Sequence, residues 1–238
     1  MTVIDARTLT VEPSGIGVYT LNLLRGIDAA GPETPVTAWV RPDVLDTLPA
    51  EVQASGALRL VPRPGRVGSG GRGGAMAGEV VHVPDVFAPL AGRTRRVVTL
   101  HDVIPLVCRG QLARSHKQRF HGVWRAWLML QTRRAVSVVT VSAFSADDIV
   151  RELRVPREKI TVIHNAVGAP EPDRDSESSS TPPAGRFVLN VGRMDPYKNV
   201  PGLVRAFARM RADHPALDDV RLVVVGAADL RYLSLIHI

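Results

Sequence analysis

Short apolar runs of four or five residues alternate along the chain with longer stretches in which apolar residues recur every three or four positions. The short runs are typical of strands buried on both faces of a sheet. The longer stretches are typical of helices that turn one face to a core. This alternation predicts the α/β class, with parallel sheets covered by helices. The predicted strands cover Val3–Arg7, Val36–Val40, Leu58–Val61, Val80–Val83, Arg96–Leu100, Val138–Val141, Ile160–Ile163, Phe187–Val191 and Leu222–Val225.

The first predicted helix follows a loop that holds two glycines, Gly15 and Gly17. Glycines directly before a helix let the loop backbone approach a ligand closely, so both are candidate ligand-binding residues. The spacing is not the full G-x-G-x-x-G dinucleotide fingerprint, and a flexible turn that starts a helix is an equally good interpretation. The apolar residues that helical spacing places on one face are Ile16, Tyr19, Leu23 and Ile27.

Residues 187–207 predict a buried strand, a tight loop and a second helix with a polar start. The loop carries Gly192, Arg193 and Lys198, and Asn199 is a good N-cap for the helix that follows. Backbone N–H groups and the dipole at a helix N-terminus attract an anion, which Arg grips with its planar fork and Lys with a compact charge. The loop therefore predicts a phosphate site. The alternative is an ordinary turn with two solvated cations.

His101 comes directly after the predicted strand Arg96–Leu100. Open α/β sheets bind ligands at the carboxyl ends of their parallel strands, so His101 is a candidate functional residue. The alternative is a histidine whose hydrogen bonds are satisfied locally.

Ser145 and Asp148 have the spacing of a capping box, with Phe144 and Ile149 as a hydrophobic staple. They predict where the next helix begins, and this structural role is enough to explain these residues without a functional one.

The charge balance favours anionic partners, because 30 Lys and Arg against 23 Asp and Glu give the 238-residue chain a net charge of +7. A Gly- and Arg-rich stretch, residues 63–78, lacks interleaved aromatic residues, so specific nucleic-acid binding is not expected. Cys108 is the single cysteine, which excludes an intrachain disulfide. The sequence shows no signal-peptide pattern and no run long enough for a membrane span, so we expect a cytoplasmic protein.

Ten basic residues against the single acid Asp102 make residues 93–134 the most basic part of the chain. One interpretation is a helix that touches an anionic membrane or faces an acceptor. The other, which we favour, is a helix packed on the sheet with a solvated basic face. The basic residues are Arg93, Arg95, Arg96, Arg109, Arg114, Lys117, Arg119, Arg125, Arg133 and Arg134.

A stretch rich in Pro, Ser and acidic residues, with no apolar periodicity, predicts a linker at residues 168–185. The domains expected are therefore an N-terminal one at residues 1–167 and a C-terminal one at residues 186–238.

Several of these motifs, in this order, resemble those of glycosyltransferase family 4. The resemblance rests on Gly15–Tyr19, His101–Leu106, Val139–Ser145, Ile160–Val167 and Phe187–Asn199, and so covers most of the chain. It implies the GT-B fold of two Rossmann-like domains, the first on the acceptor side and the second, here incomplete, on the donor side. The family usually has Asn-Gly-Val where this chain has Asn165, Ala166 and Val167, which weakens the case for close backbone approach at that point.

The family's chemistry is the retaining transfer of a sugar from a nucleotide-diphosphate sugar to a glycan or lipid-linked acceptor, and the resemblance is mannosyltransferase-like. The resemblance implies that His101 contacts the donor sugar, and that Arg193 and Lys198 stabilise the leaving diphosphate. Gly15, Gly17, Gly192 and Asn199 would complete the donor site. No metal or other cofactor is expected. Any peripheral contact of the protein with an anionic membrane would be at the inner face of the cell membrane.

Two alternatives remain open, a sugar-nucleotide epimerase of the same fold and an inactive fragment. The family's later strands and its stretch with two glutamates do not follow Gly226, and the last nine residues do not resemble the family. We therefore expect a chain truncated at its C-terminal side. The sequence does not identify the sugar, nucleotide or acceptor.

Overall fold

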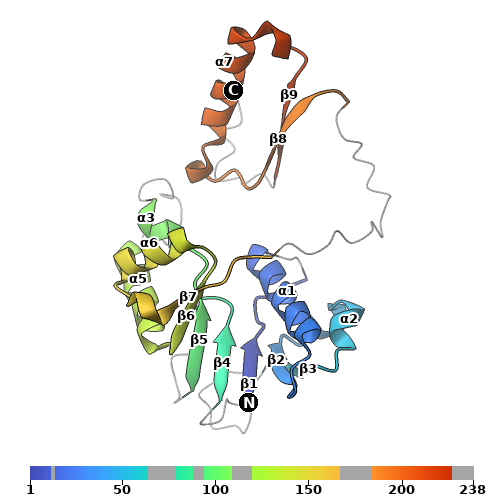
Figure 1. The fold of residues 1–238 in the computed structure, drawn as a ribbon, viewed down its shortest axis with the longest axis vertical. Helices are drawn as coiled ribbons and strands as arrows, with labels where there is room; N and C mark the ends of the chain where they lie inside the picture. The colour runs from blue at the N-terminus through green and yellow to red at the C-terminus, as the bar shows by residue number, and fades with distance from the viewer. Residues whose placement is uncertain (12–13, 64–78, 88–93, 109–119, 167–183, 227–238) are drawn as a thin grey trace. The chain divides into compact units, whose positions relative to one another are not determined.

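The computed structural model describes residues 1–11, 14–63, 79–87, 94–108, 120–166 and 184–226. These residues form two compact units, the first with strands β1 to β7 and the second with β8 and β9 (Figure 1). Every strand pairing within both units is parallel, and helices flank the larger sheet. The α/β class with parallel sheets is therefore confirmed.

The first unit contains a seven-stranded sheet in the order β3-β2-β1-β4-β5-β6-β7. Its strands are β1 (Thr2–Asp5), β2 (Val36–Val40), β3 (Leu58–Pro62), β4 (Val80–Val83), β5 (Arg95–Thr99), β6 (Ser137–Thr140) and β7 (Ile160–Val162). The chain moves outward from β1 to β3 on one side and then from β4 to β7 on the other, which is the doubly wound arrangement.

Helices cover both faces of this sheet. Because successive strand residues point to opposite faces, Val3 and Ile4 lie in two separate buried clusters, one on each face. The Val3 cluster packs β4 to β7 against the later helices, and the Ile4 cluster packs β1 to β3 against the earlier ones. The helices are α1 (Gly15–Ala30), α2 (Ala50–Gln53), α3 (Ile104–Val107), α5 (His121–Arg134) and α6 (Ala143–Leu153), with 3₁₀ turns η1 (Leu45–Thr47) and η2 (Arg157–Lys159).

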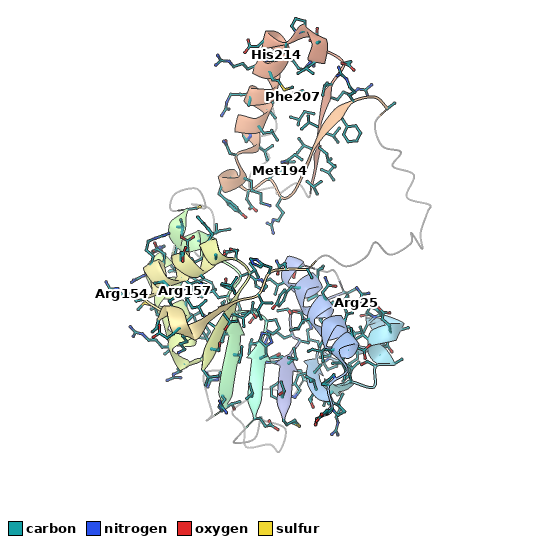
Figure 2. The ribbon with its side chains drawn as sticks, viewed as in Figure 1. Arg25, Arg154, Arg157, Met194, Phe207 and His214 are labelled. Carbon is teal, nitrogen blue, oxygen red and sulfur yellow. The ribbon has the colours of Figure 1, made fainter. Side chains whose placement is uncertain are left out.

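Helix α1 is capped at both ends. Ser14 Oγ accepts a hydrogen bond from the Gly17 N–H, and Gly31 ends the helix in the left-handed region. The fully buried residues of α1 are Gly17, Thr20 and Leu24. Of the face predicted from the apolar spacing, Leu23 and Ile27 pack against the core, and Ile16 is exposed. Arg25, labelled in Figure 2, binds Glu51 and so joins α1 to α2.

Helix α6 begins three residues earlier than the capping box predicts. Ser142, not Ser145, is the N-cap, and its Oγ accepts from the Ser145 N–H at 3.0 Å. Asp148 pairs with Arg151 instead of reaching back to the cap, and Phe144 is 75% exposed, so it forms no staple. Both Ser142 and Ser145 suit a cap, and the structure uses Ser142, with Ala146, Ile149 and Leu153 buried further along the helix.

The basic helix α5 packs on the sheet. Its buried residues are Leu128, Gln131 and Thr132, and Trp127 Nε1 donates to the Val86 carbonyl. The described part of the basic segment thus agrees with a packed helix, while residues 109–119 lie outside the described residues. None of the described helices is long and apolar enough to cross a membrane.

The second unit pairs β8 (Phe187–Val191) with β9 (Arg221–Val225), and helix α7 (Val200–Asp213) connects them with 3₁₀ turns η3 (Pro196–Lys198) and η4 (Pro215–Leu217). Figure 2 shows Phe207 on the side of α7 that faces the strands. The linker predicted at residues 168–185 lies almost wholly outside the described residues, between β7 of the first unit and β8 of the second.

Candidate functional site

The strand order reverses between β1 and β4, which are neighbours in the first sheet. In doubly wound sheets, ligands bind at the carboxyl ends of the strands at such a reversal. A ligand-binding site is therefore expected among the residues that follow β1 and β4, together with His101 after β5.

Asp5, the last residue of β1, is fully buried between two arginines. Arg63 Nε lies 3.0 Å from its Oδ1, and an Arg7 guanidinium N–H contacts its Oδ2. A buried carboxylate is stable only when it is paired in this way. Arg7 also donates from Nη1 to the Phe87 carbonyl at 2.6 Å, so the end of β1 holds the segment after β4.

Asp85 lies in that segment and is 8% exposed. Its Oδ1 accepts the Phe87 N–H at 2.7 Å, and no described residue donates to its second oxygen. Burial raises the pKa of Asp85, while the hydrogen bond from Phe87 and the positive charge of Arg7 act in the opposite direction. Asp85 is thus a buried carboxyl group with half of its hydrogen-bonding capacity unused in the described chain.

His101 lies beside the same segment. Its Nε2 is 3.1 Å from the Pro84 carbonyl oxygen, which can only accept, so this nitrogen carries the proton. In the neutral ring Nδ1 is then an acceptor, and no described residue hydrogen-bonds it. The ring is also held by Tyr19, whose own ring lies 4.6 Å away in an edge-to-face contact.

His82 supports this site from within the sheet. Its Nε2 lies 2.8 Å from the Thr99 hydroxyl. Burial lowers the pKa of His82 to about 4, with a smaller effect from His101. His82 is therefore neutral at physiological pH and serves as a packed, hydrogen-bonded residue of the sheet.

The two predicted glycines of α1 have different surroundings. A Cβ at Gly17 would lie 3.0 Å from the Thr8 carbonyl oxygen, so this glycine allows close packing of α1 on the loop after β1. Gly15 has open space around it and lies at one end of a groove of about 470 Å³. The groove runs along α1 past Tyr19 and Asn22 to Ala30, and its other wall is residues 163–166 after β7.

The loop of the second unit brings Lys198 back over Gly192. A Cβ at Gly192 would lie 3.1 Å from Lys198 Nζ, so glycine leaves room for the ammonium group. Arg193 Nε lies 3.6 Å from Asp195 Oδ2, and the Arg193 side chain is 60% exposed. The two predicted cations thus lie in one loop, and Arg193 is already paired with a carboxylate.

Asn199 occupies the N-cap position of α7 in the left-handed region, with φ of 51°. Its side chain makes no capping hydrogen bond and lies against Gly202, where a Cβ would approach within 2.4 Å. The predicted capping role of its side chain is therefore wrong, because a usual N-cap needs an extended backbone.

The described residues thus place the predicted site residues in two groups. Gly15 and His101 come together through Tyr19 in the first unit, whereas Gly192, Arg193, Lys198 and Asn199 share one loop of the second. Sequence reasoning missed Arg7 and Asp85, which no local motif marks. The only available signal was the position of Asp85 two residues after an apolar strand.

Metal ligands are not evident at this site. Among the described residues, no group of three or more His, Cys, Asp or Glu side chains could hold a metal ion. One D-x-D pair, Asp173 and Asp175, lies in the predicted linker, outside the described residues.

Comparison with known proteins bears on the first unit. The family model described as Glycosyltransferase Family 4 matches residues 13–171, about two-thirds of the chain. This match includes α1, the segment after β4, and His101. A search of the curated proteins finds no match.

Proposed function

Because the chain belongs to glycosyltransferase family 4, we propose that it transfers a sugar from a nucleotide-diphosphate sugar to a glycan or lipid-linked acceptor, with retention of anomeric configuration. The observation that carries the proposal is the family match across a doubly wound domain with a histidine at the carboxyl edge of its sheet. Mannose is the sugar that we propose first, from the resemblance noted above.

In the proposed reaction, the bond between the anomeric carbon and the diphosphate oxygen breaks as the acceptor hydroxyl oxygen bonds to that carbon on the same face. The hydroxyl proton passes to the departing phosphate oxygen. Negative charge develops on the diphosphate, and Arg193 and Lys198 stabilise it more in the transition state than in the ground state. We propose no metal, because these two cations supply the neutralising charge.

His101 orients the donor sugar in this proposal. Since its Nε2–H is committed to Pro84, the ring offers Nδ1 to a sugar hydroxyl. Gly15 leaves the backbone at the start of α1 open to the sugar nucleotide. We propose a cytoplasmic enzyme at the inner face of the membrane, on the basis of the basic segment at residues 93–134.

The test is the release of nucleoside diphosphate from GDP-mannose, UDP-glucose and UDP-N-acetylglucosamine, with glycan and lipid-linked acceptors present. We expect Lys198→Ala to lower turnover by about 10²- to 10³-fold, because one preorganised charge at the leaving group is lost. The Lys198 side chain is exposed, so the melting temperature should not change.

Arg209→Ala is the matched control, since it removes an exposed cation of α7 whose side chain is 85% exposed. Turnover by Lys198→Ala at the wild-type rate would remove Lys198 from the mechanism. Conversion of the nucleotide sugar to its epimer without transfer would replace the transferase proposal by an epimerase.

A further inference from the structure

The proposed mechanism uses the imidazole of His101 but does not explain what keeps this ring in one orientation. The Nε2 hydrogen bond to the Pro84 carbonyl oxygen, at 3.1 Å, fixes one atom of the ring. A ring held at one atom can still tilt about that contact, and Nδ1 would then point in a different direction. A fixed direction for Nδ1 therefore requires a second contact from another element of the fold.

Tyr19 of α1 supplies that second contact. The centroids of the Tyr19 and His101 rings lie 4.6 Å apart, and the two ring planes meet at 89°. This edge-to-face geometry is favourable, because the positive edge of one ring meets the negative face of the other. Tyr19 is half-buried and also lines the groove along α1. Its ring therefore restricts the tilt of the imidazole.

The first turns of α1 hold Tyr19 in this position. Gly17, two residues before it, packs closely on the Thr8 carbonyl oxygen, where a Cβ would lie 3.0 Å away. Thr20, one residue after it, is fully buried, and its hydroxyl oxygen lies 2.7 Å from that of Thr8. Both contacts join α1 to the loop after β1. The Tyr19 ring is thus held from one side of the sheet's centre and meets a histidine that follows β5.

The hydroxyl group of Tyr19 takes no part in these contacts. No described residue forms a hydrogen bond with it, whereas the ring contacts His101. The orientation of the imidazole thus depends on the aromatic ring and not on the phenol oxygen. This difference separates two possible roles for Tyr19, because a tyrosine that binds a polar ligand uses its hydroxyl as donor or acceptor.

We propose that Tyr19 is the positioning residue for His101, and that its ring and the Pro84 carbonyl together keep the imidazole protonated at Nε2 with Nδ1 directed at the donor sugar. This inference rests on the proposed function, in which His101 orients that sugar. Tyr19 acts through the histidine, so its removal changes the state of the His101 ring before it changes turnover.

The test compares three variants of the full chain. Tyr19→Phe keeps the aromatic ring and removes the hydroxyl, whereas Tyr19→Leu and Tyr19→Met both remove the ring. Phe144→Leu is the matched control, because it removes an aromatic ring that is 75% exposed on α6. Circular dichroism and thermal melting establish that each variant is folded.

The first readout requires no activity. A long-range proton–nitrogen correlation spectrum at about pH 8.5, above the ordinary pKa of histidine, distinguishes a ring protonated at Nε2 from one protonated at Nδ1. The His101→Gln spectrum identifies the signals of His101 by their absence. The second readout is the rate of nucleoside diphosphate release, measured at several concentrations of the nucleotide sugar.

We expect the wild type to show His101 protonated at Nε2 alone. Both ring-free variants should show a mixture of the two tautomers, and the ring protons of His101 should lose the ring-current shift that Tyr19 produces. Turnover in these variants should fall by about three- to tenfold with little change in the KM of the nucleotide sugar, because positioning acts mainly on the transition state. The conservative Tyr19→Phe should rescue both readouts, and Phe144→Leu should change neither.

Two results would overturn the proposal. The first is a His101 spectrum in the ring-free variants with the same tautomer as in Tyr19→Phe. The second is an equal loss of turnover in Tyr19→Phe and Tyr19→Leu, which would make the Tyr19 hydroxyl a substrate-binding group. Failure of the transferase proposal is a different observation, the absence of nucleoside diphosphate release by the wild type, and the His101 spectrum still decides the role of Tyr19.

Discussion

His82 shows how a single partly buried histidine couples this fold to pH. The sheet removes much of its imidazole from water, and this burial lowers the pKa of His82 to about 4 from the ordinary value of 6.5. Between these two values the unfolded chain binds a proton at His82 that the folded chain does not. The contribution of His82 to the free energy of unfolding is therefore fully present above about pH 6.5, and it is lost as the pH falls toward 4.

We expect His82→Gln to flatten the pH dependence of the free energy of unfolding between pH 6.5 and 4. The wild-type contribution is up to about 3 kcal/mol, because folding lowers the pKa of His82 from 6.5 to about 4. Urea titrations at several pH values measure it. His164→Gln, which removes an exposed histidine, is the control, and a wild-type slope retained in His82→Gln would contradict this account.

At the residue scale, the sequence predicted His101 but neither Asp85 nor Arg7. His101 follows an apolar run directly, so its position at a strand end can be inferred from neighbours in the sequence. The surroundings of Asp85 depend on hydrogen bonds that its neighbours Phe87 and Pro84 make with Arg7 and His101, which lie 78 and 16 positions from Asp85. Such contacts follow from strand order, which apolar periodicity does not specify.

At the scale of elements, two serine residues could each serve as the N-cap of α6. Ser142 and Ser145 are three residues apart, and the Ser142 hydroxyl both accepts from the Ser145 N–H and contacts the Ser145 hydroxyl. The structure uses the Ser142 cap, so the helix begins at Ala143.

We expect Ser142→Ala to lower the free energy of unfolding by about 1 kcal/mol, because an N-cap acceptor is lost. Ser145→Ala should cost less, since its hydroxyl caps no backbone N–H in the described structure. Chemical denaturation of the two variants measures the difference. A larger loss for Ser145→Ala would favour the helix start predicted from the capping box.

Most strand positions could be predicted, because runs such as Val36–Val40, Val80–Val83 and Phe187–Val191 are mainly apolar and bounded by charged residues, proline or glycine. The buried face of α1 could not. Thr20 is buried because its hydroxyl hydrogen-bonds Thr8 and the Ile16 carbonyl, whereas the more apolar Ile16 is exposed. The spacing of apolar residues does not predict which polar side chains find hydrogen-bond partners and become buried.

At the scale of the whole molecule, the second unit leaves one face of its sheet uncovered in the described structure. Strand alternation places Phe187, Leu189 and Val191 on one face of β8, and they are 40%, 53% and 69% exposed. Val225 of β9 pairs with Val191 and is 50% exposed. A contiguous apolar face of this kind promotes self-association.

We expect the double variant Leu189→Thr and Val191→Thr to weaken concentration-dependent self-association of the chain by about tenfold or more, because both changes remove apolar surface from that face. Analytical ultracentrifugation measures it. Val188→Thr changes the opposite face of β8, where this side chain is 41% exposed, and should weaken self-association less than the double variant does. Equal association by wild type and double variant would show that this face is not responsible.

The strand order has a consequence for how the protein is made. Strand β1 is the first to leave the ribosome, yet it ends in the middle of the sheet, between β2 and β4. At about 5–20 residues per second, β4 follows β1 by roughly 4 to 16 seconds. During that interval the edge of β1 that will pair with β4 has no partner within the nascent chain. The segment from β1 to β3 is therefore the part of this protein that we expect a ribosome-bound chaperone to bind.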